Sequence, residues 1–180
     1  MSWLDQLGGL LQQYANTDQP TQSTEQDFDQ AASVAPREAL SQGLAEAFRS
    51  NQTPPFPNML GQLFGNSSGS DRANILNTLL AAAGPALLSG GIQRGGGMGG
   101  ALGQLGSLLG GGRQLSAQDA EQIPPQAVEE LAREAEQRDP SIIDRVSEFY
   151  SENPGLVKTL GAAALAVAMS GMAKQKRGLF

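Results

Sequence analysis

The chain of 180 residues carries 18 acidic and 12 basic side chains, and it contains neither cysteine nor histidine. The lack of cysteine excludes disulfides and thiolate metal sites, and the lack of histidine removes the commonest general base and transition-metal ligand. A net charge of −6 argues against a nucleic-acid partner, because binding phosphates requires clustered Lys and Arg.

The charge is divided unevenly along the chain. Residues 1–155 hold all 18 acids and 8 bases, whereas residues 156–180 hold 4 bases and no acid. The N-terminal residues lack a basic segment before an apolar one, so they do not resemble a secretory or transit signal. We therefore expect a cytoplasmic protein of bacterial type.

Residues 1–15 predict a short amphipathic helix. Gly8 and Gly9 interrupt it, and each costs about 1 kcal/mol of helix stability relative to Ala. Between Asn16 and Ser33 the chain is rich in Gln, Thr and Asp, and Phe28 is its one large apolar side chain, so residues 16–35 predict a disordered acidic linker. The apolar stripe of the helix is Trp3, Leu4, Leu7, Leu10, Leu11 and Tyr14.

Residues 36–89 predict an N-terminal unit of three helices. The first helix ends before the proline-rich turn 53–57, because a residue that precedes proline disfavours the α region. The second is short and ends in Leu63 and Phe64, and Ser70 is a candidate N-cap for the third. The apolar faces of the first two are Leu40, Leu44, Ala47 and Phe48, then Met59, Leu60, Leu63 and Phe64.

Residues 90–115 predict a flexible Gly/Leu-rich linker. Of the 23 glycines, 13 lie between Gly84 and Gly112, and so many glycines oppose a rigid element. Residues 102–109 nevertheless repeat the pattern L-x-x-L-G-x-L-L of residues 4–11. We expect both segments to be small apolar helices that dock on a partner surface.

Residues 116–173 predict a C-terminal helical unit, followed by a basic tail over 174–180. Ser116 to Asp119 resembles a capping box, and Pro125 suits a first helical position. Asp139–Pro140 caps a helix that ends in a bulky pair, Phe149–Tyr150, and Asn153–Pro154 begins the last helix. Both units contain a helix, a proline turn, a helix with a bulky final pair and a small-residue helix, which suggests a degenerate internal duplication.

Few motifs indicate chemistry. Residues 95–100 match the dinucleotide fingerprint G-x-G-x-x-G only formally, since no predicted strand precedes them. The acidic pairs Asp27/Asp29 and Glu148/Glu152 are better explained as solvated surface than as cation sites. We expect no cofactor, no metal and no catalytic residue; an enzyme that uses surface carboxylates is the least favoured alternative.

The small-residue segment from Leu156 to Ala173 allows two interpretations. As a helix of about 27 Å it falls just short of a hydrocarbon core of about 30 Å, and it includes Lys158. We favour a buried helix at the centre of the C-terminal unit. In the alternative, the protein is peripheral to the inner membrane, with this helix at the bilayer and Lys174, Lys176 and Arg177 at anionic lipid headgroups.

Three segments of the chain resemble recurring blocks of a family of small, uncharacterised bacterial helical proteins. They are MSWLDQLGGLLQQY, TPPFPNMLGQLFGN and DPSIIDRVSEFYSENPGLVKTLGAAAL. The order of an N-terminal L-x-x-L helix, a Gly/Leu tract and a basic-apolar end is similar to the YidB-like family of unknown function. These resemblances imply an all-helical bacterial protein and no particular activity.

We therefore expect an all-α protein of two small helical units that serves as a non-catalytic interaction or self-assembly module. Its partner is a protein, either another copy or a different chain, bound through apolar surfaces that a small monomer covers incompletely. The residues expected there are Trp3, Leu4, Leu7 and Leu11; Leu102, Leu105 and Leu109; and Leu160, Ala162, Ala166 and Ser170.

Overall fold

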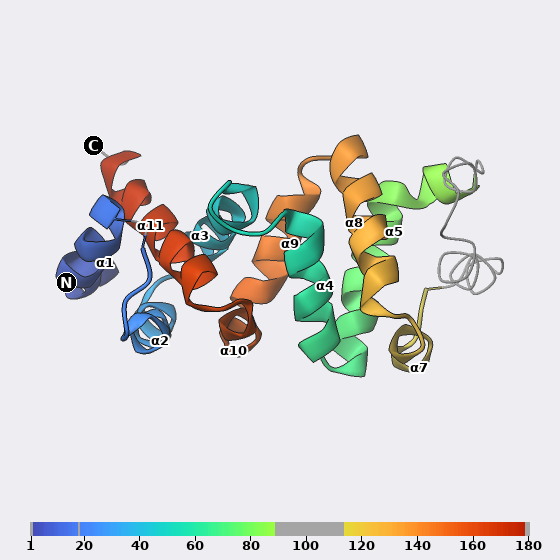
Figure 1. The fold of residues 1–180 in the computed structure, drawn as a ribbon, viewed down its shortest axis with the longest axis horizontal. Helices are drawn as coiled ribbons and strands as arrows, with labels where there is room; N and C mark the ends of the chain where they lie inside the picture. Colours follow the sequence, from blue (N-terminus) through green and yellow to red (C-terminus); the bar gives the residue numbers. More distant parts are fainter. Residues whose placement is uncertain (1, 18, 89–113, 179–180) are drawn as a thin grey trace. The chain divides into compact units, whose positions relative to one another are not determined.

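The computed structural model describes residues 2–17, 19–88 and 114–178, and of residues 17, 84–88 and 175–178 only the backbone. Every element in these ranges is a helix, which confirms the predicted all-α fold (Figure 1). The helices are α1 Trp3–Thr17, α2 Thr24–Val34, α3 Arg37–Arg49, α4 Phe56–Asn66, α5 Gly69–Leu88, α7 Ala117–Glu121, α8 Pro125–Arg138, α9 Ile142–Ser151, α10 Pro154–Val157, the 3₁₀ turn η2 Lys158–Leu160 and α11 Ala162–Gly178.

The helices form two compact units that do not follow the order of the chain. Unit 1 comprises Met1–Pro55 and Ile143–Phe180, and unit 2 comprises Phe56–Ile142. Both units therefore take helices from both halves of the sequence, in contrast to the sequential units 36–89 and 116–173 that the sequence predicts. The apolar stripes identify each helix, but they do not identify the helix that it packs against.

Unit 1 is built around α11, which packs against α1, α2 and α3 (Figure 1). Residues 164–173 of α11 are buried without interruption, and Leu165, Ala166 and Met169 have no exposed surface. A helix enclosed on all sides must be apolar all round, and its small side chains let neighbouring helices approach closely. This burial agrees with the favoured interpretation of a core helix, but its neighbours are α1, α2 and α3, not the helices of the predicted C-terminal unit.

The last helix does not begin at Asn153 as predicted. Instead α10 ends at Val157, a 3₁₀ turn follows, and Gly161 separates this turn from α11 with a φ of 94°. Side chains with a Cβ rarely adopt this conformation, so the chain turns here at a glycine. Only from Ala162 onward does the chain form the core helix.

Two glycines make the contact between α3 and α11. A Cβ at Gly43 would collide with the carbonyl oxygen of Ala168 and would lie 2.9 Å from Cγ of Met172. A Cβ at Gly171 would lie 3.0 Å from Cα of Gly43 and 2.9 Å from Cβ of Glu46. The two backbones therefore touch directly, which only glycine permits at these positions.

The predicted disordered linker over 16–35 is wrong for most of its length, because residues 24–34 form α2. Thr24, Phe28 and Ala31 are buried, and α2 packs against α11. The hydroxyl of Tyr14 on α1, itself buried, donates to Oδ2 of Asp27 at 2.6 Å. One aromatic side chain and one part-buried polar contact thus order a segment whose composition is mostly hydrophilic.

Unit 2 contains α4, α5, α7 and α8, with α8 packed against both α4 and α5, and α7 against α5. The predicted capping box is confirmed, since Ser116 and Asp119 bond to each other's backbone N–H groups, and α8 begins at Pro125 as expected. The amide of Asn77 on α5 makes two hydrogen bonds with the backbone of Leu115, 3.0 and 3.2 Å long. These bonds attach the start of the second half of the chain to α5.

Candidate interaction surface

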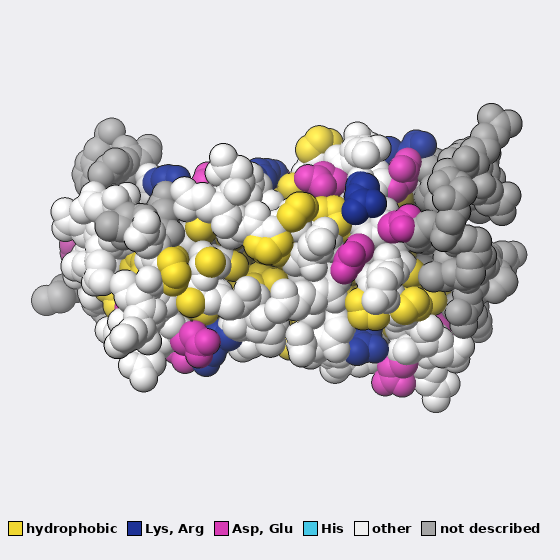
Figure 2. Space-filling model, in the orientation of Figure 1, with side chains coloured by type: hydrophobic (Ala, Val, Ile, Leu, Met, Phe, Trp, Pro, Cys, Tyr) yellow, Lys and Arg dark blue, Asp and Glu magenta, His cyan; other side chains and the backbone are white. Residues whose placement is uncertain are grey.

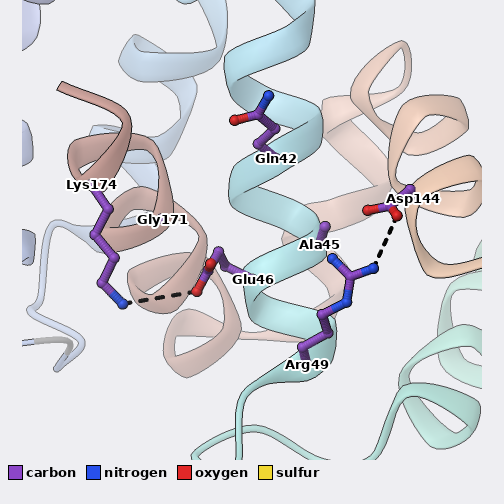
Figure 3. Close-up of a pocket in the computed structure, with 7 residues that line it drawn as sticks. All are labelled: Gln42, Ala45, Glu46, Arg49, Asp144, Gly171 and Lys174. Atoms are coloured by element: carbon purple, nitrogen blue, oxygen red, sulfur yellow. Dashed lines mark hydrogen bonds and ion pairs between the residues drawn. The ribbon is translucent and has the colours of Figure 1, made fainter. Parts of the chain in front are cut away.

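A groove of about 350 Å³ opens in unit 1 beside α3, and we name it the α3 groove (Figure 3). One wall is a stripe of α3 with the spacing i, i+3, i+4, i+7, which places its members on a single helical face. α11 and α9 supply the other lining residues. The complete lining is Gln42, Ala45, Glu46 and Arg49 of α3, Gly171 and Lys174 of α11, and Asp144 of α9.

The α3 groove is hollow because small residues line it where α3 and α11 meet. Gly171 has no side chain, and Ala45 is buried with only 4 % of its surface exposed. The same close approach that requires Gly43 and Gly171 therefore leaves space between the larger side chains of the two helices. This space arises from packing inside unit 1 and does not depend on unit 2.

Two ion pairs bridge the walls of the α3 groove. Arg49 bonds to Asp144 at 3.0 Å, and Lys174 lies 3.8 Å from Glu46 (Figure 3). All four side chains are about half exposed, and such pairs contribute only about 0–1 kcal/mol each. The groove therefore offers two cations and two carboxylates whose present partners are easily replaced.

The structure places the predicted contact residues of α1 and α11 mostly inside unit 1. Leu7, Leu11, Ala166 and Ser170 are buried at 3 % exposure or less. Within the described part of the chain, Ser170 Oγ is the one buried side-chain polar atom without a hydrogen-bond partner. These four side chains pack in the protein's own core and are not available on its surface.

The remaining predicted contact residues are half-buried or undescribed. Trp3, Leu4, Leu160 and Ala162 are half-buried, and on the face drawn in Figure 2 hydrophobic side chains over α11 emerge only as small separate patches. Among the expected membrane residues, Lys174 instead pairs with Glu46. Five predicted residues have side chains outside the described part: Leu102, Leu105, Leu109, Lys176 and Arg177.

The acidic pairs singled out in the sequence do not gather into cation sites. Asp27 accepts from Tyr14, while Asp29 bonds to Lys158 at 2.8 Å and Glu152 to Arg37 at 2.7 Å. The hydrogen bond from Lys158 to Asp29 raises the pKa of that ammonium above its ordinary value. The described ranges contain no group of three or more acidic side chains that could hold a metal ion.

Sequence reasoning missed the α3 groove. Gln42, Glu46 and Arg49 follow the pattern of a solvated helix face, which is how such polar residues are ordinarily interpreted. Nothing local to Asp144 or Gly171 indicates that they lie opposite α3. The one usable signal was the small-residue run of α11, which predicts close helix contacts but not their partner.

Comparison with family models, curated proteins and solved structures finds no match to this chain. Among the helices that the structure describes, none has the length and apolar character needed to cross a bilayer. The function of the α3 groove therefore follows only from the chemistry of the residues that line it.

Proposed function

We propose that the protein is a non-catalytic helical interaction module that binds a polypeptide segment in the α3 groove. The observation that carries the proposal is the pairing, across one cavity, of Arg49 with Asp144 and of Glu46 with Lys174. A segment that carries an acidic and a basic side chain on one face matches this arrangement. The partner is another copy of this chain or a different protein.

The charges support a peptide ligand in preference to a simple ion. An anion would meet the two carboxylates, and a cation would meet Arg49 and Lys174, whereas a segment with both signs satisfies every lining charge. Complementary charges of this kind add specificity and speed of association more than affinity.

A charge exchange tests the α3 groove without leaving a lone charge in it. The double variant Arg49→Asp with Asp144→Arg keeps one arginine and one aspartate in the pair, but the positive charge moves to α9 and the negative charge to α3. The matched control exchanges Glu134 and Arg138, an exposed i, i+4 pair of α8 in unit 2. Both double variants should retain the helicity and thermal midpoint of the wild type.

Sedimentation equilibrium over a wide concentration range then separates the two sources of the partner. If a second copy binds, the groove exchange should weaken self-association at least tenfold, and the control should not. If the wild type is monomeric throughout, a partner retained from a cell extract by wild type and control, but lost by the groove exchange, supports a different protein. A monomer with identical retention in all three proteins contradicts the proposal.

A further inference from the structure

We infer that residues 36–88 and 124–178 are two copies of one helical repeat that have exchanged their first helices, so that the binding partner of each half is the other half. The inference is independent of the α3 groove. It rests on buried positions, the order of the helices and the composition of the two units.

The first helices of the repeats, α3 and α8, share one burial pattern. Their N-caps are Pro36 and Pro124, both extended, with ψ of 153° and 151°. When residue numbers of α3 are increased by 88, each of the five buried residues of α8 aligns with a buried residue of α3. The pairs are Ala39 and Ala127, Leu40 and Val128, Gly43 and Leu131, Leu44 and Ala132, and Ala47 and Ala135.

The second helices, α4 and α9, correspond with a shift of 86 residues. The two shifts differ by two residues because the turn 50–55 is three residues longer than the turn 139–141, whereas α8 is one residue longer than α3. At the ends, the side chains of Ser67 and Asn153 donate to the carbonyls of equivalent residues, Leu63 and Phe149. The matching buried pairs are Phe56 and Ile142, Pro57 and Ile143, Leu60 and Val146, Gly61 and Ser147, and Phe64 and Tyr150.

Each first helix contacts the second helix of the other repeat, α8 by close packing against α4 and α3 by two exposed ion pairs with α9. In unit 2, a Cβ at Gly61 would touch Glu129, and a Cβ at Gly65 would lie 3.6 Å from Pro125, so α4 and α8 run antiparallel. In unit 1, Arg37 bonds to Glu152 and Arg49 to Asp144, so α3 and α9 also run antiparallel.

The registers of these two contacts agree at one end of α3. The shift of 86 residues takes Gly65 of α4 to Ser151, and the shift of 88 residues takes Pro125 of α8 back to Arg37 of α3. The contact of Gly65 with Pro125 therefore corresponds to one between Ser151 and Arg37. In the structure Arg37 bonds to Glu152, the next residue after Ser151. At the other end of α3, Arg49 bonds to Asp144, five residues beyond the position that the two shifts predict, so the registers agree only near Arg37.

The third helices complete the exchange. α11 packs against α3 and α2 in unit 1, and α5 packs against α8 and α7 in unit 2. Both third helices thus receive the first helix of the other repeat, together with the short helix that precedes it. Exchange of identical elements is a low-cost route to a two-fold assembly, and here a single chain contains both partners.

Engineered disulfides test the exchange, because the chain has no cysteine of its own. The pair Gly61→Cys with Glu129→Cys bridges α4 of the first half and α8 of the second half, at positions whose side chains would touch. A specific protease sequence inserted after Gly99 in the full chain separates the halves. The control pair, Glu134→Cys with Arg138→Cys, lies within the second half.

After oxidation and cleavage, the bridging pair should run as one band of full-chain mass without reductant and as two bands with it, whereas the control runs as two bands throughout. A cleaved chain without added cysteines should still elute as one particle of monomer mass. Halves that elute separately would overturn the inference. So would disulfides that link two different chains, since the exchange would then occur between copies.

Discussion

The glycine contacts of the two units show how similar helix pairs can be built differently. In unit 1, Gly43 faces the backbone of Ala168, and Gly171 faces Gly43 itself. In unit 2, a Cβ at Gly61 would meet only the side chain of Glu129, at 2.5 Å from Cγ. Backbone cannot move aside, whereas a Glu side chain can rotate, so we expect Gly43 and Gly171 to be strictly required and Gly61 to be replaceable.

The largest effect should come from a charge in the enclosed helix of unit 1. Ala166 has no exposed surface, so Ala166→Glu should destabilise unit 1 by several kcal/mol, since the buried carboxylate has no partner. Denaturant unfolding followed by circular dichroism measures the loss. Arg133→Glu on the exposed face of α8 is the control and should change the free energy of unfolding by less than about 0.5 kcal/mol.

The glycine substitutions test the comparison directly. Gly43→Ala should destabilise the protein by about 1–3 kcal/mol through overpacking, although alanine favours a helix. Gly61→Ala should be neutral or stabilising by up to about 1 kcal/mol, because Glu129 can rotate away and the helix gains propensity. Thermal unfolding measures the stability of both variants. Equal destabilisation would contradict the difference between the backbone contact at Gly43 and the side-chain contact at Gly61.

A polar contact in unit 1 should have a moderate effect. Tyr14→Phe removes the hydroxyl that lies 2.6 Å from Asp27 and 3.3 Å from Oγ1 of Thr24. We expect a loss of about 1–2 kcal/mol, because part-buried acceptors lose their donor. Chemical denaturation measures this change; a loss below about 0.3 kcal/mol would mean that water replaces the hydroxyl and that apolar packing alone holds α2.

The smallest effect should come from the ion pair of Lys158 with Asp29. Since folding raises the pKa of Lys158, its stabilising contribution is complete below the unfolded pKa of about 10.4 and disappears as the pH rises through the folded value. The thermal midpoints of wild type and Lys158→Gln should therefore differ slightly at pH 7 and converge above the folded pKa. A difference that persists at high pH would assign the effect to packing of the lysine stem.

The sequence predicts most helices because their signals are local. Ser116 and Pro125 begin helices where expected, and the proline-rich segment lies between α3 and α4, although α4 already begins at Phe56. α2 escaped prediction because Phe28 is a single apolar anchor in a hydrophilic segment, and its burial depends on α11, far away in the chain.

The sequence also did not predict which helices pack together, because this too depends on residues that are distant in the chain. The apolar face of α3 would fit either a neighbour in its own half or α11, and only the three-dimensional match of Gly43 with Gly171 distinguishes them. The α3 groove depends on that pairing, so its polar residues carried no separate signal. Local patterns specify helices, whereas partners are chosen by complementary shapes at long sequence distance.

Hydrogen exchange of Ala166→Glu, resolved along the chain by mass spectrometry, tests the central claim that each unit combines both halves of the sequence. We predict that protection is lost together in α1, α2 and α3 and in α9 and α11, while α4, α5, α7 and α8 stay protected as in the wild type. Loss of protection confined to residues 116–173, with α1 to α3 unchanged, would contradict the account.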